Sequence, residues 1–170
     1  GQLVSKTVAL VVGHLCSSAS IPASAAYADA RIIQISPASS VPSYTDNRAG
    51  PGTFRLCGRA DQQGQFAGAF LARAFGGKKV AFADDKSSYG KALAGAARTT
   101  FESGDRKATL VDEYYSGGRN YDSLVAELKA GGIEVLYLGG GSTDAALLAR
   151  EMKDDGMSTV IVGGDALAVD

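Results

Sequence analysis

The chain has 170 residues, 45% of them hydrophobic, which is enough for the core of one ordinary domain or of one lobe and part of another. Its 17 basic and 18 acidic residues are spread along the sequence and give a formal net charge of −1. This pattern offers no basic stripe to a phosphate backbone or an anionic lipid surface, which argues against nucleic acid and membrane partners. Two cysteines are too few for a disulfide scaffold, and the spacing of a zinc site is missing, so we expect no metal.

Short apolar runs recur along the chain, and each has the length of one strand. Runs of Val, Ile and Leu without alternation are typical of strands in a parallel sheet that helices cover on both faces. The expected strands are residues 8–12, 32–35, 80–83, 110–111, 135–138 and 160–162.

Helical patterns fill the intervals and end near glycine, which adopts the left-handed conformation beyond a helix at little cost. The expected helices are residues 62–75, 87–103, 122–130 and 143–155. In the first of them, the side chains at helical spacing are Phe66, Ala69, Phe70 and Arg73. Strands that alternate with helices predict right-handed βαβ crossovers, and therefore a Rossmann-like α/β fold with a doubly wound parallel sheet.

Residues 38–53 interrupt this alternation. They contain two prolines, two glycines and little periodicity, so we expect a loop there and a lobe boundary shortly after it. On this interpretation residues 1–60 form part of an N-terminal lobe with two βα units. Residues 61–170 form a nearly complete C-terminal lobe.

Small hydroxyl residues and glycines follow the apolar runs, at the edge where ligands bind in open α/β sheets. Serine caps helices, and glycine lets a ligand approach the backbone, so a carboxylate could rest against amide donors at the helix N-termini. Helix capping without a ligand is the alternative for each serine. Asp84 and Asp85 are interpreted in the same way, as capping carboxylates.

Motifs for catalysis are missing from the sequence. His14 is the only histidine, there is no nucleophile elbow or phosphate-binding loop, and Gly139–Gly141 is not a dinucleotide fingerprint. Cys16 lies two residues from His14, but no third group is evident that would orient such a pair. A phospho-receiver domain would need an aspartate where the chain has Tyr114–Ser116. We therefore expect a binding protein that is not an enzyme and uses no cofactor.

Six ordered motifs carry a family resemblance: GHLCSS, IPASAAY, IIQISPASS, DDKSSYGKALA, YDSLVAELKAGGIEVLYLGGG and VIVGGDAL. In this order and spacing the chain resembles the leucine/isoleucine/valine-binding proteins of ABC transporters over nearly all of its length, and covers the middle part of the family length. The resemblance implies a type I periplasmic binding fold, in which two lobes close on a branched-chain amino acid. It also implies a periplasmic location and an ABC transporter permease as partner.

The same resemblance implies which residues bind the ligand. Residues of the first lobe hold the α-carboxylate and the ammonium through backbone and hydroxyl groups. In the second lobe, Tyr89 lines the cleft and Asp165 pairs with the ammonium. The expected ligand-binding residues are Ser17, Ala38, Ser39, Ser40, Tyr89, Gly141 and Asp165.

Two positions leave the identity of the ligand open. Leucine-specific members commonly carry glutamate where this chain has Asp165, and an aromatic residue in the turn where it has Gly139–Gly141. A larger amino acid or an aromatic acid is therefore an alternative ligand. A cytoplasmic ligand sensor or regulator is the alternative function, because the same two-lobe architecture serves both uses.

Two expectations concern association and the cysteines. Residues 1–60 supply only two strands of a lobe, so an uncovered sheet favours a domain-swapped dimer of the 170-residue chain. Cys16 and Cys57 are expected to form no intrachain disulfide, because a long loop separates them.

Overall fold

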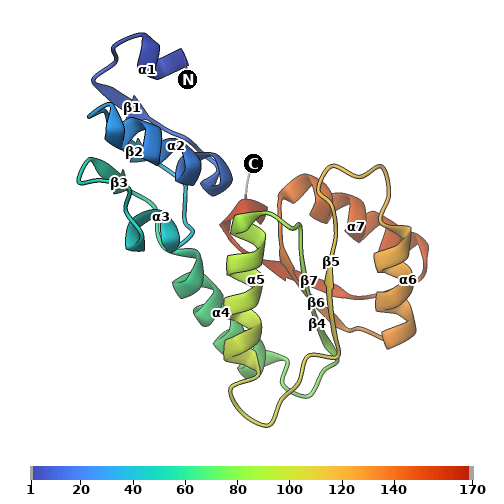
Figure 1. Cartoon of the computed structure of the whole chain (residues 1–170). Coiled ribbons are helices and arrows are strands. Elements are labelled where there is room, and N and C mark those ends of the chain that lie inside the picture. Colours follow the sequence, from blue (N-terminus) through green and yellow to red (C-terminus); the bar gives the residue numbers. More distant parts are fainter. Residues whose placement is uncertain (1, 169–170) are drawn as a thin grey trace. The chain divides into compact units, whose positions relative to one another are not determined.

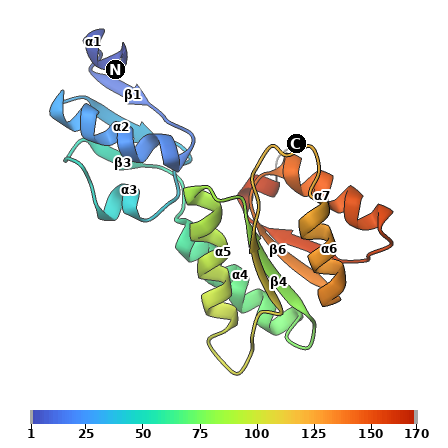
Figure 2. The ribbon, with the colours of Figure 1, turned by 45° about the vertical axis from the view of Figure 1, so that its right-hand side comes forward.

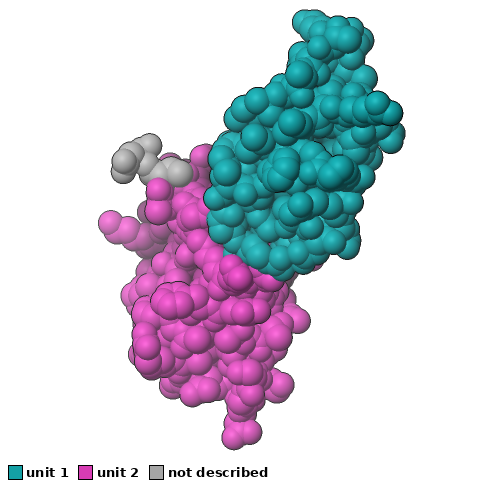
Figure 3. Space-filling model, turned by 90° about the vertical axis from the view of Figure 1, so that its left-hand side faces the viewer, with its two compact units in different colours: residues 1–60 teal, residues 61–170 magenta. Residues whose placement is uncertain are grey.

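The computed structural model describes residues 2–168, which form two compact units with the boundary between Ala60 and Asp61 (Figure 3). Both units consist of parallel strands that alternate with helices (Figure 1), which confirms the expected α/β class. Within the described residues, no helix has the length and apolar character that crossing a membrane requires.

The first unit contains a three-stranded parallel sheet in the order β1-β2-β3. Leu10 pairs with Ile33 across the first two strands, and Gln34 pairs with Thr53 across the second and third. The strands are β1 (Leu10–Val12), β2 (Ile33–Ser36) and β3 (Thr53–Arg55), and the helices are α1 (Gln2–Ser5), α2 (Ser17–Asp29) and α3 (Ser43–Asp46).

Residues 1–60 were expected to hold two βα units and a loop, and the structure adds a third strand, β3, to the sheet and places α3 within the expected loop. β3 has only three residues and a single large apolar side chain, Phe54, so it leaves no recognisable period in the sequence. Pairing with β2 nevertheless gives partners to backbone groups that would otherwise lie open at the sheet edge.

Helix α2 packs on this sheet with an unusually polar face. Its buried residues are Ser17, Ser20, Ser24 and Tyr27, and the sheet residues that are buried are Val11, Gln34, Ser36 and Thr53. The apolar core of the unit is correspondingly small, with Val11, Tyr27 and Ile32 at its centre. Hydrogen bonds of serine hydroxyls, most of them to backbone groups, therefore take part in joining this helix to the sheet beside the small apolar core.

Alternate residues of the same strands point to the other face of the sheet, which is apolar and uncovered. We call Leu10, Val12, Ile33 and Phe54 the open face. Their exposed fractions are 48%, 72%, 44% and 43%. Surfaces of this kind are normally covered by another element or another molecule.

The second unit contains a four-stranded parallel sheet in the order β5-β4-β6-β7. Val135 in the centre of the sheet pairs with Val80 on one side and Val160 on the other. The strands are β4 (Val80–Asp84), β5 (Leu110–Glu113), β6 (Val135–Gly139) and β7 (Val160–Gly163). The helices are α4 (Ala60–Ala74), α5 (Ser88–Phe101), α6 (Asp122–Gly131) and α7 (Ser142–Asp154), followed by the 3-10 turn η1 (Asp165–Leu167).

Helices cover both faces of this sheet, as the uninterrupted apolar runs predicted (Figures 1 and 2). One layer joins the sheet to α6 and α7 and includes Ala81, Leu136, Leu138, Leu128 and Leu148. The other joins it to α4 and α5 and includes Phe82, Val135, Leu71, Leu93 and Phe101.

Helix α4 approaches α5 through two glycines one turn apart. A Cβ atom on Gly64 would lie 2.6 Å from the carbonyl oxygen of Leu93, and one on Gly68 would lie 2.8 Å from Cβ of Thr100. The aromatic side chains by which the helix was predicted are not part of its buried side, since Phe66 is 77% exposed and Phe70 is 37% exposed. The helix was thus predicted correctly, although its buried residues are Ala60, Gly64, Gly68 and Leu71.

The ends of two helices show why glycine marks them. Gly132 after α6 has φ of 63° and Gly156 after α7 has φ of 75°, both in the left-handed region that residues with a Cβ rarely adopt. At the N-terminus of α5, the Ser87 hydroxyl accepts a hydrogen bond from the amide of Gly90 at 2.9 Å, which confirms serine as a helix cap there.

Strand β5 lies at an edge of the sheet, and its own side chains occupy part of that edge. Oδ1 of Asp112 accepts a hydrogen bond from the amide of Glu113 at 2.7 Å. Oε1 of Glu113 in turn forms an ion pair with Nζ of Lys91 at 3.0 Å. Charged side chains and locally satisfied amides are features that make an edge strand a poor template for further pairing.

Candidate functional site

In the first unit, serine hydroxyls converge on the backbone carbonyl oxygen of His14 just after β1. The hydroxyls of Ser20, Ser36 and Ser39 lie 3.1, 2.6 and 3.2 Å from it. Ser39 is fully buried, and its hydroxyl also lies 2.7 Å from Oγ of Ser20. The Ser39 side chain therefore joins the ends of β1 and β2 instead of pointing to solvent.

Ser17 and Ser40 lie at the same edge of this sheet and differ in their hydrogen bonding. Oγ of Ser17, which is buried at the start of α2, accepts a hydrogen bond from the amide of Val41 at 3.3 Å. The hydroxyl of Ser40 is buried and has no partner among residues 2–168. Since an unpaired buried hydroxyl costs about 1 to 3 kcal/mol, Ser40 is the serine of this turn with unused capacity for a ligand. Ala38, half-buried, begins the turn.

Arg55 at the end of β3 holds this turn in place. Its guanidinium donates to the carbonyl oxygens of Ser39 and Val41 at 3.3 and 3.0 Å and to Oγ1 of Thr45 at 2.6 Å. The sequence analysis missed Arg55, because a single arginine after one phenylalanine has no distinguishing spacing. Charged hydrogen bonds to two carbonyl groups fix the peptide plane before Ser40 and the peptide plane after Val41.

The two cysteines also lie in the first unit. Cys16 is exposed at the N-cap position of α2, and Cys57 is half-buried after β3. Neither takes part in a disulfide in the structure. The absence of an intrachain disulfide between Cys16 and Cys57 stays a prediction that mass spectrometry of a non-reducing digest can test.

In the second unit, Tyr89 and Asp165 meet at the edge formed by the carboxyl ends of the strands. Tyr89 lies in the first turn of α5, Asp165 begins η1 after β7, and the Tyr89 hydroxyl donates to Oδ1 of Asp165 at 2.7 Å. Burial raises the pKa of Tyr89, and the hydrogen bond to Asp165 raises it further. The phenol therefore stays protonated and acts as a donor to the carboxylate.

Gln63 on α4 is a second partner of Asp165. With its amide nitrogen facing the carboxylate, Gln63 donates to Oδ1 at 2.9 Å, and its amide oxygen accepts from the backbone amide of Asp165 at 3.2 Å. Both donors thus bind the same oxygen, and no hydrogen bond within residues 2–168 reaches Oδ2. Gln63 was not among the expected site residues, since it lies inside a helix and far from any strand end in the sequence.

The three glycines at the end of β6, Gly139–Gly141, have different surroundings. A Cβ atom on Gly139 would lie 3.0 Å from Cβ of Ala94 and would also collide with the carbonyl oxygen of Gly90. One on Gly140 would collide with the hydroxyl of Tyr114. Gly141, the N-cap residue of α7, has open space around the position of a Cβ atom. Packing therefore requires glycine at the first two positions, whereas the third leaves room for a side chain or for a ligand.

Asp84 and Asp85 hold the turn that leads into α5. Oδ1 of Asp84 accepts from the amide of Lys86 at 2.9 Å, and Oδ1 of Asp85 accepts from the amide of Ser87 at 3.0 Å. The two aspartates therefore fix the turn before α5, whereas the N-cap of the helix is Ser87, so the interpretation of both residues as capping carboxylates was wrong. The described residues contain no group of three or more His, Cys, Asp and Glu side chains that could hold a metal ion.

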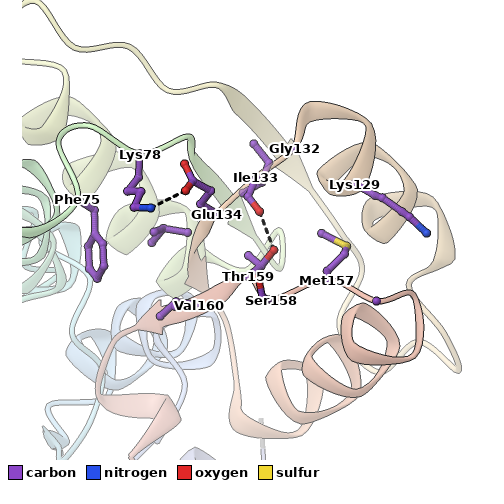
Figure 4. A pocket seen from close by; sticks show the side chains of 12 residues that line it. Phe75, Lys78, Lys129, Gly132, Ile133, Glu134, Met157, Ser158, Thr159 and Val160 are labelled. Atoms are coloured by element: carbon purple, nitrogen blue, oxygen red, sulfur yellow. Dashed lines mark hydrogen bonds and ion pairs between the residues drawn. The ribbon is translucent and has the colours of Figure 1, made fainter.

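A separate pocket of about 410 Å³ lies at the opposite edge, where β6 and β7 begin (Figure 4). Several of its polar groups already have partners, since Nζ of Lys78 lies 2.6 Å from Oε1 of Glu134 and the Thr159 hydroxyl donates to the carbonyl oxygen of Ile133 at 2.7 Å. Ligands in open α/β sheets bind beyond the carboxyl ends of the strands. We therefore place the candidate site at the Tyr89–Asp165 edge and not in this pocket.

The expected site residues thus form two groups, each at the carboxyl ends of the strands of its own unit. Ser17, Ala38, Ser39 and Ser40 make up the first. Tyr89, Gly141 and Asp165 make up the second, with Tyr89 and Asp165 in direct contact. A family model described as "Periplasmic binding protein" matches residues 2–169. The chain belongs to the periplasmic binding protein family.

The relatives most useful for comparison are proteins named for amino acid binding. An "Amino acid binding protein" from Pseudomonas aeruginosa is 40% identical over 160 residues, which is 94% of this chain and 42% of the relative. A "Leu/Ile/Val-binding protein homolog 1" from Brucella abortus is 38% identical over 94% of this chain and 43% of its own length. The expected resemblance to the leucine/isoleucine/valine-binding proteins is confirmed. The chain spans less than half the length of these relatives, which are named as binding proteins and not as enzymes.

A solved structure of the same family shows the same fold. The crystal structure of a leucine binding protein from Thermotoga maritima matches with a TM-score of 0.84 at 19% identity, over 95% of this chain and 46% of that chain. This agreement confirms the α/β architecture expected for a type I periplasmic binding protein.

Proposed function

We propose that the protein is an extracytoplasmic solute-binding protein of an ABC transporter and that it binds an amino acid of the branched-chain type. The observation that carries the proposal is the similarity to amino acid binding proteins, which extends over 94% of the chain. Family membership and the absence of catalytic motifs support a role in binding without chemical change of the ligand. An extracytoplasmic location in the periplasm follows from the family and is part of the proposal.

The two groups of polar residues suit the two charged groups of an amino acid. Ser40 offers a buried hydroxyl that has no partner in the described part of the chain, and Ser17, Ala38 and Ser39 shape the turn around it, so this group would bind the α-carboxylate. Asp165 offers a carboxylate oxygen to which none of the described residues donates, and this oxygen would accept the ammonium, while Tyr89 orients the carboxylate and lines the site. Gly141 leaves space for the side chain of the ligand.

Substitution of Asp165 tests the proposal in the protein at its full natural length. A hydrogen bond to a charged group contributes about 1.5 to 3 kcal/mol, so Asp165→Ala should weaken amino acid binding by at least about 10-fold. Isothermal titration calorimetry with leucine, isoleucine, valine and phenylalanine measures this loss. Asp154→Ala, an exposed aspartate at the end of α7, is the control and should bind like the unaltered protein. Equal affinity in the Asp165 variant would refute the role of this carboxylate.

The ligand class and the biological role need separate measurements. A thermal-shift screen with amino acids and aromatic acids identifies the ligand, because a molecule that binds the native state raises its melting temperature. Cell fractionation of the natural host distinguishes the proposed receptor from a cytoplasmic sensor or regulator with the same fold. A cytoplasmic protein that responds to an amide or an aromatic acid would support that alternative.

Two partners belong to this proposal. As a receptor the protein would deliver its ligand to an ABC transporter permease. The 170-residue chain by itself would form a domain-swapped dimer, because exchange of the first unit between two copies would cover the open face.

A further inference from the structure

The Asp165 carboxylate accepts hydrogen bonds from two side chains, and one of these side chains also accepts a hydrogen bond from the Asp165 backbone. Gln63 contributes a donor to Oδ1 at 2.9 Å and an acceptor for the backbone amide of Asp165 at 3.2 Å. Tyr89 contributes a second donor to Oδ1 at 2.7 Å. The side chain and the backbone of Asp165 are therefore fixed together, which one hydrogen bond could not achieve.

The elements that carry these three residues are packed so closely that they cannot shift independently. Gly64, next to Gln63, lacks the side chain that would strike the carbonyl oxygen of Leu93, so α4 lies directly against α5, the helix of Tyr89. Gly164, next to Asp165, allows the same close approach. A Cβ atom there would lie 2.7 Å from the Tyr89 hydroxyl and 3.0 Å from the Gln63 side chain.

We propose that Gln63 is a positioning residue that makes the site selective for ligands with an ammonium group. The inference rests on the proposed function, in which Asp165 accepts the ligand's ammonium. Because Gln63 and Tyr89 both donate to Oδ1, the carboxylate is held in one orientation and Oδ2 stays available for the ligand. A carboxylate that is oriented before binding loses less conformational freedom when the ligand arrives, which raises affinity.

The neutral amide of Gln63 is matched to this task. A glutamate at position 63 would place a second negative charge against Oδ1 of Asp165, and it would offer no donor to that oxygen. An apolar side chain of similar length, such as methionine, would fill the space on α4 but would leave Oδ1 with Tyr89 alone. Comparing these two substitutions therefore distinguishes the effect of the size of the Gln63 side chain from the effect of its hydrogen bonds.

The experiment compares an amino acid with the matching 2-hydroxy acid, which has the same shape and carboxylate but no ammonium. In the full natural length of the protein, Gln63→Met should lower the affinity for leucine by roughly 3- to 10-fold, as expected for one lost hydrogen bond. The affinity for 2-hydroxy-4-methylpentanoate should not change. Gln63→Glu should reduce leucine affinity further than Gln63→Met. Gln65→Met, on the exposed side of the same helix, is the matched control and should bind both ligands normally.

A second comparison shows whether Gln63 acts through Asp165. In an Asp165→Asn background, Gln63→Met should have no additional effect on leucine affinity, since there is no charged carboxylate left to orient. Equal losses for leucine and the 2-hydroxy acid would show a merely structural role and overturn the inference, as would leucine binding that Gln63→Met leaves unchanged. Failure of the unaltered protein to bind any amino acid would instead overturn the proposed function, and the inference with it.

Discussion

The hydroxyl of Tyr121 donates a hydrogen bond of 2.7 Å to Oδ1 of Asp144. Both residues are buried, Tyr121 at the N-cap position of α6 and Asp144 in the first turn of α7. The same carboxylate accepts hydrogen bonds from the Ser116 hydroxyl at 2.6 Å and from the amide of Gly117 at 3.1 Å. Burial by itself would raise the pKa of Asp144, but the hydrogen bonds from Ser116, Tyr121 and Gly117 outweigh it and hold the pKa below its usual value. One buried charge therefore fixes the loop between β5 and α6.

Asp144→Asn should lower the free energy of unfolding at neutral pH by about 1.5 to 3 kcal/mol, because the amide cannot accept all three hydrogen bonds of the carboxylate. The lowered pKa of Asp144 stabilises the fold fully above the unfolded value of about 3.9, and this contribution is lost as the pH falls through the folded value. Urea unfolding should thus show the difference between the two proteins shrinking below that range. Asp154→Asn should behave like the unaltered protein at every pH, and a constant difference would contradict the assignment.

Two tyrosines with buried rings should respond oppositely to loss of the hydroxyl. The hydroxyl of Tyr137 is fully buried without a partner among the described residues, so Tyr137→Phe should leave the free energy of unfolding equal or higher. Tyr121→Phe removes the bond to Asp144 and should lower it by about 1 to 3 kcal/mol. Chemical denaturation measures both. A clear loss of stability in the Tyr137 variant would reveal a partner for its hydroxyl.

Serine substitutions at Gly140 and Gly141 should have different effects on stability, because Gly140 is closely packed and Gly141 has open space around it. Gly140→Ser should lower the free energy of unfolding by about 1 to 3 kcal/mol, because its Cβ atom would collide with the hydroxyl of Tyr114. Gly141→Ser should be neutral within about 0.5 kcal/mol, since the position is open and serine is a favoured N-cap residue. Thermal unfolding of the two variants gives the comparison directly. Similar effects at both positions would contradict the local geometry.

The isolated 170-residue chain should run as a dimer in multi-angle light scattering, because the open face of the first unit is apolar. Val12→Lys, at a side chain that is 72% exposed, should shift the chain toward monomer without loss of secondary structure. Lys6→Ala, away from the strands of the sheet, should leave the dimer intact. A monodisperse monomer of the unaltered chain would contradict this expectation.

The sequence predicted strands that carry a continuous apolar run and helix ends that are marked by glycine. All six apolar runs overlap a strand, and four of these strands lie in the second unit, where helices cover both faces of the sheet. Gly132 and Gly156 marked helix ends because glycine adopts the left-handed conformation at little cost. β3 escaped detection because three residues carry no period, and its existence depends on β2 being available as a partner.

The site could be predicted only in part. The positions of Tyr89 and Asp165 followed from strand ends and from the family resemblance, while their contact of 2.7 Å depends on how β7 and α5 pack. Gln63 forms hydrogen bonds with Asp165, 102 positions away, and Arg55 with Ser39, 16 positions away. No local sequence pattern predicts contacts between residues so far apart in the chain. The buried face of α4 was hidden for a related reason, since Gly64 and Gly68 look like weak helix formers until α5 is seen against them.

The side chains along β5 bear on how the protein would misfold. With Asp112 bonded to the amide of Glu113 and Glu113 paired with Lys91, a strand from another molecule would have to displace these bonds before it could extend the sheet there. β1 has no comparable charges and presents Leu10 and Val12 to solvent. Fibrils or amorphous aggregates, if the chain forms them, should therefore grow from the sheet of the first unit, and protection against amide exchange should be gained at β1 before β5.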